Sequence, residues 1–93
     1  MIRSFADPET ERIWNRDRSR RLRADMQQRA MRRLTLLDSA QSLGELGNLK
    51  GNRLHALKDD RAGQHSISIN TQWRICFVWK DGHAHDVEIT DYH

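Results

Sequence analysis

The stretch Gln72-Trp73-Arg74-Ile75-Cys76-Phe77-Val78-Trp79 decides the fold, and Asp81-Gly82 follows it closely. Its large apolar side chains recur at every second position, which predicts a β-strand with one buried face. Arg74 belongs to the opposite face. Asp-Gly is a strong signal for a two-residue hairpin, so a second strand over residues 83–90 should return antiparallel to the first.

The segments before this hairpin complete a mixed pattern. We expect strands over residues 2–5, 53–57 and 64–69, and helices over residues 8–14 and 19–40. Asp7 and Pro8 form a helix-start signal, in which the Asp side chain can accept hydrogen bonds from the first-turn amides. The apolar stripe of the second helix consists of Leu22, Met26, Ala30, Leu34 and Leu37. Three glycines then break the helical pattern: Gly44, Gly47 and Gly51.

These elements predict an α+β fold in a single domain that spans residues 1–93. A small antiparallel-rich sheet should carry two N-terminal helices on one face, packed against the row of large side chains that begins at Trp73. The other face, which carries Arg74, is expected to remain open.

Arginine dominates the charge of the chain. The formal net charge is +3, and 13 of the 16 basic residues are Arg. A planar guanidinium suits phosphate oxygens, so a polyanion is a natural partner. Arg21, Arg29 and Arg32 should point away from the apolar stripe, where they contact nucleic-acid phosphates, form a solvated helix face, or do both.

Several classes of function lack their signatures. A single cysteine, Cys76, excludes an internal disulfide and suits a small buried strand residue in a reducing cytoplasm. No apolar run approaches the roughly 20 residues of a membrane span, and the first residues lack the shape of a signal peptide. No nucleotide-binding loop or zinc motif is present, so no cofactor and no metal are predicted. His83 and His85 are interpreted as surface histidines of the hairpin.

The last residues, Asp91, Tyr92 and His93, place an acid, a phenol and an imidazole side by side, and His55 precedes them in an earlier strand. Cleavage of RNA by its own 2′-hydroxyl needs a base, an acid and a cation that stabilises the added phosphate charge. Histidine can serve as either base or acid near neutral pH, and arginine can hold phosphate oxygens, without a metal. The alternatives without a catalytic role are a structural salt bridge for Arg74 and a frayed polar tail for the last three residues.

Taken together, several stretches resemble the HigB-type toxins of the RelE/ParE superfamily, and the resemblance covers essentially the whole chain. They are Gly51 to Lys58, Arg61 to Ile67, Asn70 to Phe77 and the closing Asp91-Tyr92-His93. The resemblance implies a small sheet with two packed helices. It also implies cleavage of mRNA in the ribosomal A site and an adjacent helix-turn-helix antitoxin of the HigA type, with which the toxin reaches operator DNA.

The resemblance also implies the residues of an active site. His55 and His93 would transfer protons, Arg74 and Lys58 would stabilise phosphate charge, Tyr92 would stack on or orient the nucleotide, and Asp91 would orient a neighbour or share in proton transfer. Two positions depart from many relatives, because Asp59 stands where Gly is usual and Ser68 where several carry Arg. A carboxylate beside Lys58 weakens phosphate contact, so a weak toxin is plausible.

Two other functions stay open from the sequence. The chain could be a non-enzymatic toxin that resembles the ParE toxins and binds DNA gyrase. It could also act mainly as a co-repressor, binding operator DNA together with its antitoxin. The acid–base set formed by His55 and the closing Asp91-Tyr92-His93 favours the nuclease, since a binding protein has no need of it.

Overall fold

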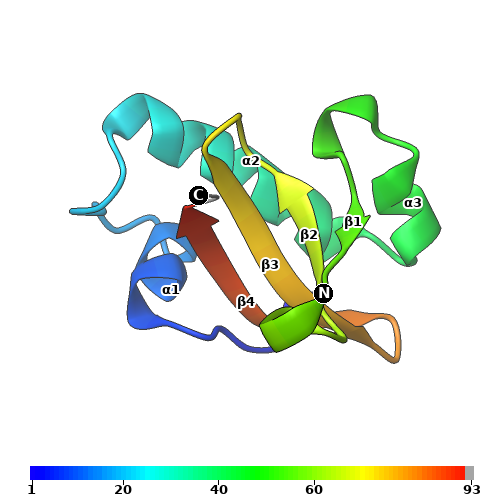
Figure 1. Ribbon diagram of the computed structural model, residues 1–93. Coiled ribbons are helices and arrows are strands. Elements are labelled where there is room, and N and C mark those ends of the chain that lie inside the picture. The colour runs from blue at the N-terminus through cyan, green and yellow to red at the C-terminus, as the bar shows by residue number, and fades with distance from the viewer. Residues whose placement is uncertain (92–93) are drawn as a thin grey trace.

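A four-stranded antiparallel sheet is the framework of the molecule, and its strands lie in the order in which they occur along the chain (Figure 1). The computed structural model describes residues 1–91, and of Lys50 the backbone only. The strands are β1 (His55–Ala56), β2 (His65–Ser68), β3 (Trp73–Lys80) and β4 (His83–Asp91). The hairpin predicted at Asp81-Gly82 joins β3 to β4, and both residues adopt the positive φ that this turn requires.

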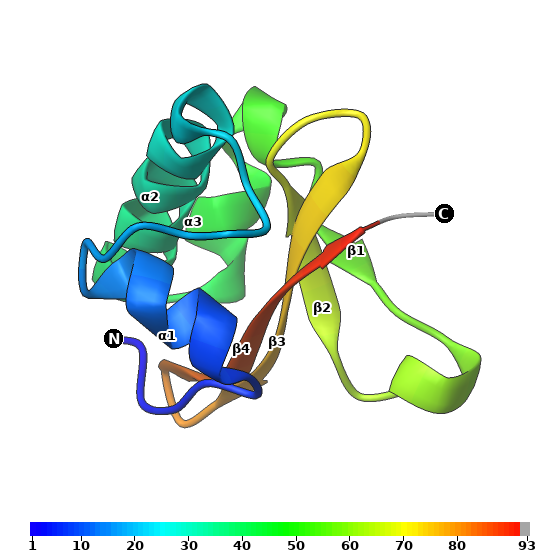
Figure 2. The ribbon, with the colours of Figure 1, turned by 90° about the vertical axis from the view of Figure 1, so that its left-hand side faces the viewer.

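Three α-helices cover one face of the sheet. They are α1 (Pro8–Trp14), α2 (Ala24–Ser39) and α3 (Leu43–Gly47), and two short 3-10 turns are η1 (Lys50–Asn52) and η2 (Asp59–Arg61). Seen along the sheet, the helices lie on one side, and the β1–β2 connection, which contains η2, stands on the other (Figure 2). The predicted α+β architecture is therefore confirmed. None of the helices in residues 1–91 has the length and apolar character to cross a membrane.

The core lies between the helices and the sheet. The predicted row of large side chains on β3 faces it, because Ile75 and Phe77 are fully buried and Trp73 and Trp79 pack against its margin. The predicted stripe of α2 meets this row through Ala30, Leu34 and Leu37, none of which is exposed to solvent. Burial of these apolar surfaces is the main force that holds the helices on the sheet.

A β-bulge interrupts the pairing of β3 with β4. Cys76 pairs with Glu88, but Val78 pairs with His85, so Phe77 faces two residues of β4. One of them, Asp86, has a φ of 51°, as is usual where an extra residue enters a strand. The bulge keeps both Ala84 and Val87 in the core, although they are three positions apart.

The first residues do not form the predicted strand. They make two isolated parallel bridges to β4, Ile2 to Ala84 and Phe5 to Val87, on either side of the bulge. Regular pairing cannot pass the bulge, and the amide of Asp86 is instead bonded to the hydroxyl of Ser4 at 2.9 Å. Residues 1–6 still cover the edge of β4.

The second helix begins five residues later than predicted. Residues 19–23 form a loop because the Ser19 hydroxyl accepts from the amides of Arg21 and Leu22 and donates to Glu9 Oε1 at 2.7 Å. Such local side-chain bonds compete with helix formation. Leu22 is nevertheless buried, which explains why it fitted the apolar stripe.

Three further expectations were wrong in detail. Asp7 precedes α1 as predicted, but its side chain makes no cap hydrogen bond. Gly44 and Gly47 lie within α3, which the Ser42 hydroxyl caps by accepting from the amide of Glu45. The strand expected over residues 53–57 is reduced to β1, because Arg53 has a left-handed backbone with a φ of 46°.

Candidate active site and basic surface

A pocket of about 280 Å³ lies on the sheet face that points away from the helices. Its lining residues come from β2, β3, β4 and the β1–β2 connection. They are Leu57, Arg61, Ser66, Arg74, Cys76, Thr90 and Asp91. Two residues predicted from the sequence, Arg74 and Asp91, thus meet at one site.

Strand register places the polar side chains of this pocket on a common face. Ser66 is paired with Cys76, and Arg74 with Thr90, so the side chains of each pair lie on the same side of the sheet. His55 is paired with Ser66 and therefore belongs to this face as well. Strand pairing alone therefore places the side chains of His55, Ser66 and Arg74 on one surface of the sheet.

Hydrogen bonds to the neighbouring strand and to the chain before β1 hold Arg74 in place. Its Nε donates to Ser66 Oγ at 2.8 Å, and its Nη2 donates to the carbonyl oxygen of Arg53 at 2.9 Å. The residue is only 8% exposed. The prediction of an open face was therefore wrong at this point, because Arg74 is buried and the chain before β1 reaches its side chain through the Arg53 carbonyl. A guanidinium oriented in this way is suited to an anion that enters the pocket from outside.

Asp91 ends β4 at the rim of the pocket and is exposed. Its Oδ2 accepts from Gln72 Nε2 at 3.1 Å, across the end of the β3–β4 pair. The carboxylate is therefore oriented by a neighbouring side chain. Tyr92 and His93, the other predicted residues of this group, lie outside the described residues.

The two remaining site residues, His55 and Lys58, flank Leu57, which lines the pocket. His55 is exposed on β1, and Lys58 is exposed directly before η2. Neither lines the pocket itself. Asp59, the departure noted in the sequence, adopts a φ of 55°, a left-handed conformation that glycine reaches without steric cost.

Sequence reasoning missed five pocket residues as functional candidates: Leu57 and the four polar ones, Arg61, Ser66, Cys76 and Thr90. Arg61 Nη1 donates to Glu88 Oε1 at 3.0 Å, an ion pair between residues 27 positions apart. Cys76 is the buried free thiol that the sequence predicted, and burial raises its pKa above the ordinary value. The strand alternation that assigned Arg74 to this face could also have placed Ser66 there, but not Arg61.

The three arginines predicted to contact RNA have different surroundings. Arg21 is not on a helix: its Nη2 donates to the Ile89 carbonyl at 2.6 Å, and its guanidinium lies 5.7 Å from the Trp73 ring centre. It therefore supports the end of the sheet rather than pointing away from the core. Arg29 and Arg32 are exposed on the outer face of α2, as predicted.

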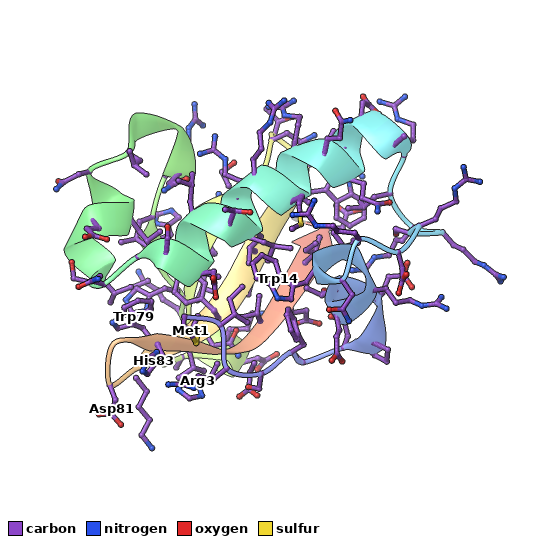
Figure 3. The ribbon with its side chains drawn as sticks, turned by 180° about the vertical axis from the view of Figure 1, so that it is seen from behind. Met1, Arg3, Trp14, Trp79, Asp81 and His83 are labelled. Carbon is purple, nitrogen blue, oxygen red and sulfur yellow. The ribbon has the colours of Figure 1, made fainter. Side chains whose placement is uncertain are left out.

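The histidines of the β3–β4 hairpin lie apart from the pocket. Figure 3 shows His83 beside Arg3, and Arg3 Nη2 is 3.3 Å from His83 Nε2. Desolvation, together with the positive charge of Arg3, lowers the pKa of His83, so the neutral ring is favoured. Within residues 1–91, no group of three or more His, Cys, Asp or Glu side chains could hold a metal ion.

Known proteins resemble this chain in sequence and in fold. A family described as "RelE-like toxin of type II toxin-antitoxin system HigB" matches residues 3–93. The chain belongs to this HigB-like family. It is 34% identical to "Endoribonuclease HigB" of Proteus vulgaris over 93 residues, with both proteins covered completely. It is 35% identical to "Toxin HigB-1" of Vibrio cholerae over 85 residues, or 90% of each protein.

Solved structures share the fold of this HigB-like chain. The YoeB–YefM complex of Staphylococcus aureus contains a chain that superposes with a TM-score of 0.61 at 19% identity, covering 100% of this chain and 98% of the other. A heterotetrameric YoeB–YefM toxin–antitoxin complex of the same organism gives a TM-score of 0.60 at 20% identity, with the same coverage. At this identity the likeness concerns the fold alone.

Proposed function

We propose that this HigB-like toxin is an endoribonuclease that cleaves mRNA in the ribosomal A site. The observation that carries the proposal is the fixed guanidinium of Arg74, which lines the same pocket as Asp91. Asp91 is followed directly in the chain by Tyr92 and His93. The name of the Proteus vulgaris relative, which calls that protein an endoribonuclease, supports the same activity here.

The proposed reaction is a transfer within the RNA backbone. A base takes the proton of the 2′-hydroxyl, whose oxygen attacks the neighbouring phosphorus. The bond from phosphorus to the 5′-oxygen breaks, and an acid protonates that oxygen. The products are a 2′,3′-cyclic phosphate and a free 5′-hydroxyl, and no metal ion takes part.

The roles of the residues follow their positions. His55, on the open sheet face, and His93 are the proposed proton-transfer pair. Arg74 stabilises the extra negative charge of the transition state, because its planar fork is already oriented before RNA binds. Lys58 adds a second positive charge from the edge of the site. Asp91 orients a neighbouring group, and Tyr92 stacks on the nucleotide.

The outer face of α2 serves a different purpose in this proposal. Arg29 and Arg32 are exposed and attract the RNA phosphates of the ribosome over a distance, without touching the reacting atoms. Arg21 is tied to the sheet, and we assign it a weaker contribution.

We also propose a protein partner and a location. The YoeB chains were solved together with an antitoxin, which supports an antitoxin partner for this toxin. We propose that this partner is of the helix-turn-helix HigA type, as the sequence resemblance implies. The complex would bind its operator DNA through the antitoxin. The toxin would act in the cytoplasm, where translating ribosomes are found.

A cleavage assay tests the proposal directly. New 5′ ends on a defined mRNA are mapped in a translation extract, with and without ribosomes, for the wild type and for His93→Ala. We expect new ends that require both the ribosome and His93. His83→Ala is the matched control, since His83 lies on the distant hairpin.

The other outcomes are equally informative. Cleavage without ribosomes would contradict the ribosome requirement, and full activity of His93→Ala would remove His93 from the site. If the folded wild type produces no new ends, the nuclease is excluded and gyrase inhibition or operator binding becomes the function to measure.

A further inference from the structure

A second arginine, Arg61, faces the same pocket from the turn η2. Its Nη1 donates to Glu88 Oε1 at 3.0 Å and to Gln64 Oε1 at 3.1 Å. The side chains of Arg61 and Glu88 are 36% and 32% exposed, so the ion pair lies at the mouth of the pocket. Water and an entering ligand can therefore both reach it.

The strands bring Arg61 close to Arg74. Glu88 and Thr90 are two positions apart on β4, where they pair with Cys76 and Arg74. Two residues along a strand correspond to about 7 Å. The charges of Arg61, Glu88 and Arg74 all influence the pKa of the Cys76 thiol at the pocket floor, which is raised chiefly by burial. Both arginines therefore face a single space.

The Glu88 carboxylate is a replaceable partner. Ion pairs exposed to this degree contribute little to stability, because water already solvates both charges. A phosphate of the RNA backbone carries a full negative charge and offers two oxygens to the guanidinium fork. An incoming RNA phosphate can therefore take the place of the carboxylate at low cost.

We propose that Arg61 binds an RNA phosphate next to the scissile phosphate at Arg74, and that Glu88 holds the Arg61 guanidinium until RNA enters. This inference rests on the proposed nuclease function. It adds Arg61, which lies in η2 before β2, to the residues that bind the substrate. It also means that the Glu88 carboxylate competes with RNA for Arg61.

A purely structural role for the pair makes a different prediction. If Arg61 and Glu88 only fasten η2 to the sheet, loss of either partner weakens the same contact and affects cleavage in the same direction. If Arg61 binds an RNA phosphate, loss of Arg61 removes an attraction for RNA. Loss of the Glu88 charge instead removes a group that competes for Arg61 and repels the phosphate. The two substitutions then act in opposite directions.

The experiment compares Arg61→Gln and Glu88→Gln in steady-state cleavage of mRNA on programmed ribosomes. We expect Arg61→Gln to raise KM by about 10-fold, with kcat changed less than about twofold, because uniform binding is lost. Glu88→Gln should lower KM by about two- to threefold. Arg61→Gln should also reduce the slope of log KM against log salt by about one, the signature of one lost phosphate contact.

Controls separate the possible failures. Arg3→Gln removes an arginine that lies beside the β3–β4 hairpin and does not line the pocket, so it should leave KM unchanged. Thermal unfolding verifies that each variant is folded. If Arg61→Gln does not fold, Arg61→Lys takes its place and should still raise KM, since it keeps one charge but loses the fork. Equal KM for wild type and Arg61 variants, or a rise in KM for both partners, overturns the inference alone. A wild type without cleavage overturns the proposed function instead.

Discussion

Arginines on the two faces of this molecule differ in how they are held. On the sheet face that points away from the helices, Arg74 is bonded to Ser66 and to a backbone carbonyl, and Arg61 is bonded to Glu88. On the outer face of α2, the side chains of Arg29 and Arg32 make no hydrogen bond or ion pair with any residue from 1 to 91. The arginines of the sheet face are arranged to contact a phosphate at a fixed position. Those of α2 are arranged to attract RNA from any direction.

Loss of the Arg74 fork should have the largest effect. Arg74→Lys keeps the charge but cannot make the same two hydrogen bonds, so stabilisation of the transition state is lost. We expect the single-turnover rate of cleavage on ribosomes to fall by about 10²- to 10³-fold, the usual cost of one such donor. A fall of less than about fivefold in a folded variant would show that charge alone is sufficient there.

Ser66 offers a finer test of the same idea. Ser66→Ala removes the hydroxyl that accepts from Arg74 Nε, and a hydrogen bond to a charged group is worth about 1.5–3 kcal/mol. If about half of that serves to orient the guanidinium, kcat falls by about 3- to 10-fold. Ser68→Ala is the matched control on the same strand, because the Ser68 hydroxyl bonds to the Asn70 carbonyl instead. Equal loss of kcat in both variants would show that Ser66 merely supports the strand.

Exposed arginines of α2 should matter less, and only at low salt. Replacing Arg29 and Arg32 with Gln removes two unfastened charges, so association with the ribosome should slow by about three- to tenfold at low ionic strength. The difference should shrink as salt screens the attraction, while kcat stays unchanged. Stopped-flow binding at several salt concentrations measures both effects. A change in kcat would place one of these residues at the reacting atoms.

The smallest effect concerns the loop before α2. A hydrogen bond from Ser19 is the main cause of the lowered pKa of Glu9, so Ser19→Ala should raise that pKa toward the ordinary value. Because the folded pKa lies below the unfolded one, this bond stabilises the protein above the unfolded pKa and ceases to do so as pH falls through the folded pKa. NMR titration of Glu9 in both proteins measures the shift. An unchanged pKa would mean that the amide of Arg20 and the nearby charges of Arg12 and Arg21 hold the carboxylate without Ser19.

Short-range patterns explain what the sequence could predict. The alternation of β3 and the Asp81-Gly82 turn were read correctly, since each depends on residues close together in the chain. The same alternation placed Arg74 on the correct face. Its hydrogen bond to the Arg53 carbonyl could not be foreseen, because it requires the residues before β1 to reach across the sheet.

Other features depend on partners that no local pattern reveals. The bulge at Asp86 leaves no recurring pattern in the sequence. An aspartate with a left-handed backbone cannot be told from any other polar strand residue by its sequence alone. The late start of α2 depends on a bond between Ser19 and Glu9 of the preceding helix. Arg61 and Glu88 meet only after three strands have paired, so the second cation of the pocket was missed.

Coverage of the β4 edge by residues 1–6 has a consequence for biosynthesis. Ser4 and Asp86 are bonded although 82 positions separate them, so residues 1–6 stay without sheet partners until β4 has emerged from the ribosome. Pairings between such distant segments form slowly, because a long loop must close first. The growing chain can therefore gather its helices early, but it closes the sheet edge only late in synthesis.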